Sequence, residues 1–133
     1  MRKIEHIGIA VKDLKAANDT YSKLLNTQPY KLEAVESESV STSFFKIGDT
    51  KIELLEATSE TSAIAKYIEK RGEGIHHIAY DVLDIQAERE RLIEEGFQPI
   101  GDIKPGADNK LVCFFHPKSA NGVLVELCQE RSE

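Results

Sequence analysis

The chain has 133 residues, which is the length of one domain that buries its own hydrophobic core. Hydrophobic residues make up 41% of it and charged residues 30%, as in water-soluble globular proteins. The formal net charge of −6 argues against nucleic acid as a partner, and no apolar run is long enough for a membrane span.

Cellular location is predicted from the N-terminus and from two cysteines. The apolar start of the chain is too short for a signal peptide and is interrupted at Asp13. Cys113 and Cys128 lie in the apolar runs LVCFF and LVELCQ, which fits buried thiols in a reducing compartment better than a disulfide framework. We therefore expect a cytoplasmic protein.

The first half of the chain predicts one strand, one helix and three further strands. An apolar, β-branched run predicts a strand over residues 4–11. Asp13 is a candidate N-cap for LKAANDTYSKLL, where apolar residues recur at helical spacing. The remaining strands are expected over the following ranges: 29–36, 40–47 and 51–56.

The rest of the chain predicts a linking helix and then the same order again. TSAIAKYIEKRG predicts the linking helix, with Thr61 or Ser62 as its cap and Gly72 as its stop. A strand over residues 75–82 precedes a helix that begins after Asp84 and stops at Gly96. The last three strands are expected over the following ranges: 97–101, 111–116 and 123–128.

An internal repeat explains this order. IEHIGIAVKDLKAA, from Ile4, aligns with IHHIAYDVLDIQAE, from Ile75, at an offset of 71 residues. His6 then meets His77, whereas His76 meets Glu5. We predict a single domain built by duplication, with module one over about 1–58, the linking helix over about 61–71 and module two over about 73–133.

Strand alternation places the twin histidines on one face of the sheet. His6 shares its face with Gly8 and Ala10, and the opposite, β-branched face is expected to pack under the helix. His77 is likewise followed two residues later by a small residue, Ala79. The histidine face therefore leaves room over the sheet.

The repeat also pairs two glutamates. Glu53 in KIELL meets Glu126 in LVELC at an offset of 73. Two imidazoles and two carboxylates suit a divalent transition metal with positions left open for water or substrate. We predict that the metal ligands are His6, Glu53, His77 and Glu126. His76 and His116 are expected to serve packing or the mouth of the site.

Four segments resemble one known family. HIGIAVKDL, GDTKIELLE, EKRGEGIHHIAYDV and HPKSANGVLVEL together resemble the methylmalonyl-CoA epimerases, which belong with the glyoxalases to the vicinal oxygen chelate superfamily. The resemblance runs from Ile4 to Gln129. It implies an α+β fold in which two tandem βαβββ modules form a cupped, partly closed mixed β-sheet around a metal site. It also implies one divalent metal ion, either cobalt, zinc, nickel, manganese or iron, on the same four ligands.

The resemblance implies a reaction on an acyl-CoA substrate. The family epimerises C2 of methylmalonyl-CoA through a metal-stabilised enolate, and proton exchange on both faces needs two carboxylates. Glu53 and Glu126 are the first candidates. The family's Pro-Glu-Gln-Gly element falls on ESES, residues 36–39, so its glutamate position is Ser37, and Glu36 or Glu38 is an alternative base.

Several predictions concern partners and competing functions. Lys110, Lys118 and Arg71 are candidate contacts of the CoA phosphates, and a homodimer is expected because dimers are common among similar proteins. A glyoxalase I-type enzyme acting on a thiol hemithioacetal has the same ligand set. A bleomycin-resistance-like binding module does not need that set, and ring-cleaving dioxygenases are usually much longer.

Overall fold

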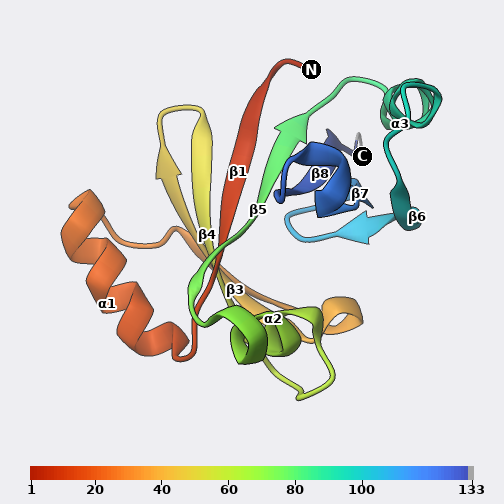
Figure 1. Cartoon of the computed structure of the whole chain (residues 1–133). Helices are drawn as coiled ribbons and strands as arrows, with labels where there is room; N and C mark the ends of the chain where they lie inside the picture. Colours follow the sequence, from red (N-terminus) through yellow and green to blue (C-terminus); the bar gives the residue numbers. More distant parts are fainter. Residues whose placement is uncertain (132–133) are drawn as a thin grey trace. The chain divides into compact units, whose positions relative to one another are not determined.

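The computed structural model describes residues 1–131, and it has the predicted order of two βαβββ halves joined by a helix (Figure 1). The bounds of the first half are β1 (Lys3–Ala10), α1 (Leu14–Leu25), β2 (Lys31–Val35), η1 (Glu36–Glu38), β3 (Val40–Ile47) and β4 (Thr50–Ala57). The linking helix is α2 (Ala63–Arg71). The second half contains β5 (Gly74–Asp81), α3 (Ile85–Glu94), β6 (Pro99–Gly106), β7 (Lys110–Phe115), η2 (Pro117–Ala120) and β8 (Leu124–Glu130).

The repeat seen in the sequence is confirmed in the backbone. β1 and β5 begin and end 71 residues apart, and α1 and α3 begin at the same offset. The hydrogen-bonded strand order is β2-β3-β4-β1-β5-β8-β7-β6. Counted from its own end of this order, each half has its second strand first, followed by its third, fourth and first strands. The mixed α+β architecture predicted for the chain is therefore correct.

The predicted helix caps are present. The Asp13 carboxylate accepts from the Ala16 N–H at 3.2 Å, and that of Asp84 accepts from Ala87 N–H at 3.1 Å. Ser62, rather than Thr61, caps α2. These side chains satisfy backbone donors that the first helical turn leaves unpaired.

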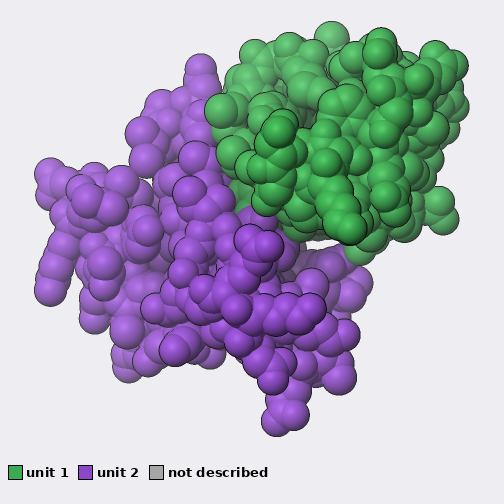
Figure 2. All heavy atoms as spheres, viewed as in Figure 1, with its two compact units in different colours: residues 1–6, 77–133 green, residues 7–76 purple. Residues whose placement is uncertain are grey.

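The described chain divides into two compact units, which Figure 2 shows in different colours. One unit contains residues 1–6 together with residues from 77 onward, and the other contains residues 7–76. The division falls within β1 and within β5. The start of β1, including His6, thus belongs with the second module.

In the unit of residues 7–76, the two faces of the strands meet different helices. Val11, Phe45 and Leu54 form a core cluster that packs against apolar residues of α1. The β-branched face of the first strand was predicted to pack under this helix. Ala10 and Leu55 belong to a second cluster, which includes residues of α2. The linking helix therefore covers the face that carries Ala10.

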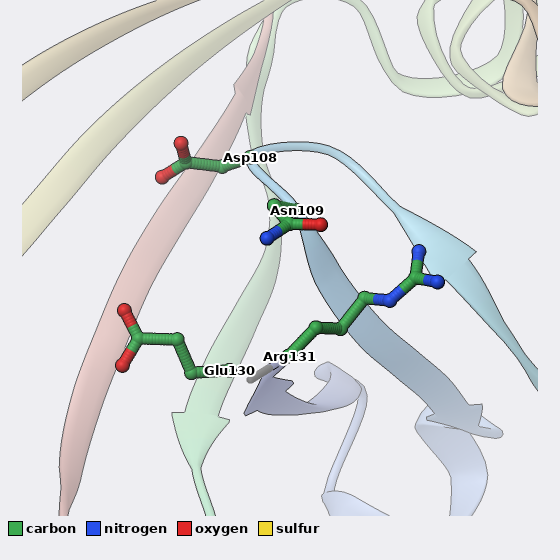
Figure 3. A pocket seen from close by; sticks show the side chains of 4 residues that line it. All are labelled: Asp108, Asn109, Glu130 and Arg131. Atoms are coloured by element: carbon green, nitrogen blue, oxygen red, sulfur yellow. The ribbon is translucent and has the colours of Figure 1, made fainter. Parts of the chain in front are cut away.

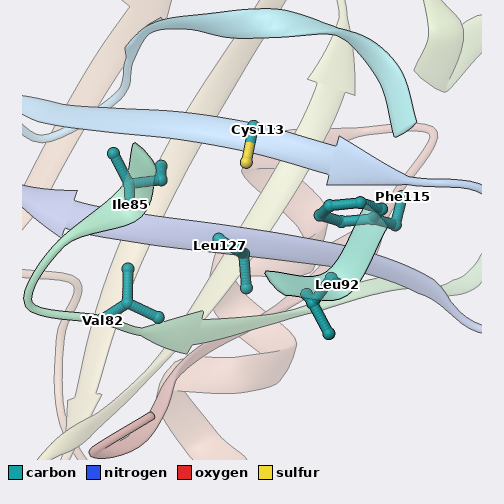
Figure 4. Close-up of a cluster of buried hydrophobic side chains, with 6 residues drawn as sticks. All are labelled: Val82, Ile85, Leu92, Cys113, Phe115 and Leu127. Carbon is teal, nitrogen blue, oxygen red and sulfur yellow. The ribbon is translucent and has the colours of Figure 1, made fainter. Parts of the chain in front are cut away.

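In the other unit, α3 closes the core over β7 and β8. The cluster in Figure 4 consists of six buried side chains: Val82, Ile85, Leu92, Cys113, Phe115 and Leu127. Phe115 and Leu127 are fully buried, and Tyr80 packs against the cluster. The opposite face of these strands carries a smaller apolar cluster of Ala79, Val112 and Cys128, against which Phe114 packs. This second face is the one that carries His77 and Glu126.

The strand predicted over 97–101 was wrong in its bounds, because β6 runs from Pro99 to Gly106. Pro105 and Gly106 read as strand breakers, but β6 is the last strand of the sheet and pairs only with β7 among the described strands. A proline is tolerated at such an edge. A Cβ atom at Gly106 would lie 2.8 Å from Val112 Cγ1, so glycine permits the close approach of the two strands.

Among residues 1–131, no helix has the length and apolar character needed to cross a bilayer.

Candidate metal centre

Three predicted ligands converge within the unit that contains residues 1–6 and the second module. His6 Nε2 lies 3.0 Å from His77 Nε2, and His77 Nε2 lies 3.0 Å from Glu126 Oε1. The third side of this triangle, from His6 Nε2 to Glu126 Oε1, measures 3.3 Å. All three residues are buried, with 5–6% of their surface exposed.

The register of three strands brings these side chains together. On β5, Ala79 follows His77 on the same face, and it pairs with Glu126 on the parallel strand β8. Phe114 pairs with Glu126 on the other side, and its ring lies at right angles to that of His77. The small side chain of Ala79 leaves space above it, while Phe114 limits the freedom of His77.

The donor atoms fit a divalent metal ion. For metal–nitrogen and metal–oxygen bonds of about 2.0–2.2 Å, neighbouring ligand atoms lie about 2.8–3.6 Å apart at octahedral to tetrahedral angles. The three observed separations of 3.0–3.3 Å fall within this range. Two imidazoles and a carboxylate are ligands that zinc, cobalt, nickel, manganese and iron all accept, so the donor set fits a metal without selecting one.

Each of two ligands has a buried partner on its other side. His6 Nδ1 lies 2.6 Å from Glu5 Oε1, and the Cys128 thiol donates to Glu126 Oε2 at 3.2 Å. These contacts leave His6 Nε2 and Glu126 Oε1 directed at the shared point. Hydrogen bonds of this kind orient metal ligands and raise the basicity of a ligating histidine.

The electrostatics of the cluster favour an ionised Glu126. Burial alone would raise the pKa of its carboxyl group, but in the metal-free site the charge of a protonated His6 and the hydrogen bonds of both histidines lower that pKa well below its ordinary value. The apolar surroundings formed by Ala79, Val112 and Phe114 strengthen such charge interactions. Glu126 is thus available as an anionic ligand across the physiological pH range.

The other predicted carboxylates lie in the unit of residues 7–76. Glu53 is buried in β4, with 5% of its surface exposed, and pairs in register with Phe44. Glu36 is exposed and Glu38 is half-buried, both in the 3-10 turn η1 that follows β2. Their roles as ligand or base stay predictions.

His76 and His116 have other contacts. The His76 ring stacks edge-on against Tyr67 of α2, with centroids 4.9 Å apart. His116 Nδ1 accepts from the Lys118 N–H at 3.0 Å and so caps η2. Neither belongs to the group formed by His6, His77 and Glu126.

The two lysines predicted to meet CoA phosphates differ in their surroundings. Lys118 is exposed, whereas Lys110 is buried, with its ammonium 3.8 Å from Glu5 Oε2 and 4.0 Å from Glu130 Oε2. Close by is a hollow of about 290 Å³, shown in Figure 3 and lined by Asp108, Asn109, Glu130 and Arg131. The carboxylates of Asp108 and Glu130 outnumber the one cation in its wall, that of Arg131, which disfavours a phosphate there.

Sequence reasoning missed Glu5 and Cys128. Glu5 is the repeat partner of His76, so the comparison that identified His6 gave it no weight. Glu5 stands out only by being buried directly beside a predicted ligand, and the strand pattern does not reveal that burial. Cys128, two residues after Glu126 on the same strand face, was readable from alternation alone.

Comparison with known proteins gives consistent matches. A family described as the Glyoxalase/Bleomycin resistance protein/Dioxygenase superfamily matches residues 5–114. The ethylmalonyl-CoA/methylmalonyl-CoA epimerase of Cereibacter sphaeroides is 43% identical over 130 residues, which is 96% of this chain and 97% of that protein. The mitochondrial methylmalonyl-CoA epimerase of Homo sapiens is 36% identical over 129 residues, covering 96% of this chain and 73% of that protein.

A solved structure extends the likeness to the fold. A variant of the methylmalonyl-CoA epimerase of Streptomyces coelicolor, in complex with 2-nitronate-propionyl-CoA, superposes with a TM-score of 0.95 at 33% sequence identity. The match covers 99% of this chain and 96% of that chain.

Proposed function

This chain belongs to the glyoxalase/bleomycin resistance protein/dioxygenase superfamily, and on that premise we propose that it is an epimerase acting at C2 of methylmalonyl-CoA. This substrate is proposed because the chain is similar to a methylmalonyl-CoA epimerase over nearly the full length of both proteins. The convergence of His6, His77 and Glu126 on one point supports the metal-dependent chemistry.

The substrate sets the chemical problem. C2 of methylmalonyl-CoA carries a hydrogen between a thioester and a carboxylate, and removing that proton produces an enolate. Epimerisation requires that a proton returns to the opposite face of the planar carbon. The site must therefore hold the substrate in place, tolerate developing negative charge and offer a proton-transfer group on each side.

His6, His77 and Glu126 would hold the metal ion. When bound, a divalent cation supplies Lewis-acid stabilisation of the negative charge that develops on the substrate oxygens. The chain's own contribution is to keep the two Nε2 atoms and the carboxylate oxygen 3.0–3.3 Å apart in an apolar, buried setting.

We propose Glu53 as the fourth ligand and as one of the two proton-transfer groups, opposite Glu126. Glu53 is the repeat partner of Glu126, it is buried, and alternation places it on the β4 face of Leu55, which packs with Ala10. Glu56, the neighbour that made the register ambiguous, lies on the other face and accepts from the Leu14 N–H. Glu36 and Glu38 remain alternative bases.

The remaining proposals concern the rest of the substrate and the assembly. Lys118 and Arg71 are both exposed, which supports them as contacts of the CoA phosphates.

We also propose that the protein is a homodimer. We propose a reducing, cytoplasmic compartment because both cysteines are buried and form no disulfide.

Hydrogen exchange at C2 tests the function directly. The metal-loaded protein is incubated with methylmalonyl-CoA in D₂O, and deuterium at C2 is followed by mass spectrometry. We expect incorporation at a rate that depends on protein concentration and is lost after chelation. Absence of exchange, together with turnover of a thiol hemithioacetal, would replace the epimerase by a glyoxalase I-type enzyme.

A further inference from the structure

A buried chain of polar contacts runs from Lys110 to the candidate metal centre. The Lys110 ammonium lies 3.8 Å from Glu5 Oε2, and Glu5 Oε1 lies 2.6 Å from His6 Nδ1. The other ring nitrogen of His6 belongs to the triangle with His77 and Glu126. Glu5 and Lys110 are 2% and 6% exposed, so these polar contacts are shielded from water.

The chemistry of the Glu5–His6 contact fixes which atom donates. An ionised carboxylate has no hydrogen to give, so the N–H at His6 Nδ1 donates to Glu5 Oε1. A neutral imidazole protonated at Nδ1 has its lone pair at Nε2, which is the form that binds a metal. Glu5 thus selects the ligating tautomer and fixes the ring plane.

Lys110 keeps a negative charge on Glu5 tolerable in this buried position. A carboxylate without a compensating partner is costly in a buried site. Lys110 comes from the start of β7, and its second carboxylate neighbour, Glu130, is largely exposed. The Lys110 ammonium, 3.8 Å from Glu5 Oε2, offsets the charge of a carboxylate whose other oxygen faces His6 Nδ1.

We propose that Glu5, supported by Lys110, is a positioning residue that holds His6 with Nδ1 protonated and Nε2 directed at the metal. This inference depends on the metal centre proposed above. Orienting partners of this type usually change metal affinity by about 10–100-fold when removed. The effect should therefore be visible in metal binding as well as in turnover.

The alternative is that Glu5 matters only as the partner of Lys110. Replacing Glu5 alone would then lower stability by leaving the buried ammonium with only the largely exposed Glu130 as a carboxylate neighbour, and metal binding would fall as a consequence. The double variant Glu5→Leu with Lys110→Met separates the two roles. It removes the buried ion pair as a unit and affects only the exposed Glu130 besides, but His6 Nδ1 still has no carboxylate acceptor.

Zinc is the probe, and three quantities are measured for the full-length protein. They are the zinc dissociation constant by competition with a chromophoric chelator, the unfolding free energy without metal, and the His6 Nδ1 proton resonance of the zinc-loaded protein. In the double variant we expect an unfolding free energy above that of Glu5→Leu and zinc affinity still lowered about 10–100-fold. The downfield His6 ring proton should move or exchange rapidly.

Two further variants complete the design. Glu5→Gln keeps an oxygen acceptor without charge, so it should bind zinc more tightly than Glu5→Leu, with the His6 proton shifted toward a weaker hydrogen bond. Glu130→Leu removes the other neighbour of Lys110 and should leave zinc affinity and the His6 proton unchanged. Glu5→Gln also decides the matter if the double variant does not fold.

Zinc affinity of the double variant within about twofold of wild type, well below the 10–100-fold loss expected, would overturn the positioning role. An unchanged His6 proton in Glu5→Gln and in the double variant would do the same. Failure of the metal centre itself looks different, because the wild-type protein would then bind no zinc at the His6 ring.

Discussion

The two halves of the molecule repeat one backbone but not one environment. β1 and β5 occupy equivalent places, yet the residue before each twin histidine differs in kind and in contact. Glu5 is buried and bonded to His6, whereas His76 stacks on Tyr67 of the linking helix. The repeat therefore accounts for the histidines, while the group that orients His6 belongs to the first half alone.

The twin glutamates differ in the same way. Cys128 lies two residues after Glu126 and donates its thiol hydrogen to that carboxylate. The corresponding residue after Glu53 is Leu55, whose side chain has no hydrogen-bond donor and packs in an apolar cluster. The internal repeat thus pairs the candidate ligands, but the residues next to them differ between the two halves.

The compact units show why this asymmetry is possible. Residues 1–6 belong with the second module, so His6 shares its unit with His77 and Glu126, while Glu53 belongs to the unit of residues 7–76. A strand divided between two units has two sets of neighbours along its length.

The largest expected effect compares the twin carboxylates. If Glu53 exchanges protons on one face of C2, Glu53→Gln should slow deuterium incorporation into the epimer whose C2 hydrogen faces it by about 10²–10⁴-fold, the usual contribution of general acid–base catalysis. The rate is measured by mass spectrometry at saturating metal.

Glu56→Gln is the matched control for that experiment. It removes the negative charge but keeps an oxygen that accepts from the Leu14 N–H on the opposite strand face, so it should change stability only slightly and leave the exchange rate nearly unchanged. A normal exchange rate in Glu53→Gln would exclude Glu53 as a base and leave Glu36 and Glu38 to be tested.

The next effect compares the adjacent histidines of β5. His77→Ala removes a ligand nitrogen, so its zinc affinity should fall by more than about 100-fold, beyond the range found for residues that only orient a ligand. His76→Ala should leave zinc affinity close to wild type, because His76 contacts Tyr67. Competition with a chelator measures both, and the reverse result would show that the strand register assigned to β5 is wrong.

The fold was predictable from the sequence wherever the signal was local. Caps at Asp13 and Asp84, periodic helices and β-branched strands all lie within short windows, and the repeat tested each element against its twin. The end of β6 was not predictable, because Pro105 and Gly106 break strands unless the strand lies at a sheet edge. Edge position is a property of the whole topology.

The candidate site was predictable only in its repeated part. His6, His77 and Glu126 were identified because twins recur, and the structure brings these three together. The pairing of Glu5 with Lys110 joins residues 105 positions apart, and no sequence period connects them. Lys110 looked like a surface cation because lysine is almost never buried without a partner, and its partner could not be read from the chain.

A smaller effect, on the pH dependence of the unfolding free energy, should distinguish the helix-facing cores of the two units. Burial raises the pKa of the Cys113 thiol to about 11, from an ordinary 9.0, whereas the cluster under α1 consists of Val11, Phe45 and Leu54, with no thiol among them. Because the folded thiol stays neutral, its stabilising contribution is complete below pH 9 and is lost as pH rises from about 9 to about 11. The loss should be at most about 3 kcal/mol, because one pKa unit corresponds to about 1.4 kcal/mol.

Urea unfolding at several alkaline pH values measures this loss. Cys113→Ala should be less stable at pH 8 because it creates a cavity, but its unfolding free energy should fall less steeply above pH 9 than that of wild type. Identical slopes would show that the thiol ionises equally in the folded and unfolded chains.

The smallest effect concerns a feature that the two halves share. Asp13 and Asp84 cap α1 and α3 through equivalent bonds of 3.2 and 3.1 Å to the third residue of each helix. Asp13→Ala and Asp84→Ala should each lower the unfolding free energy by about 1 kcal/mol. Because the caps lie in different units, thermal unfolding also reports whether the units unfold together. One shared transition, shifted equally by both variants, indicates cooperative unfolding, whereas two transitions that respond separately would show that the halves are independent in stability as well as in environment.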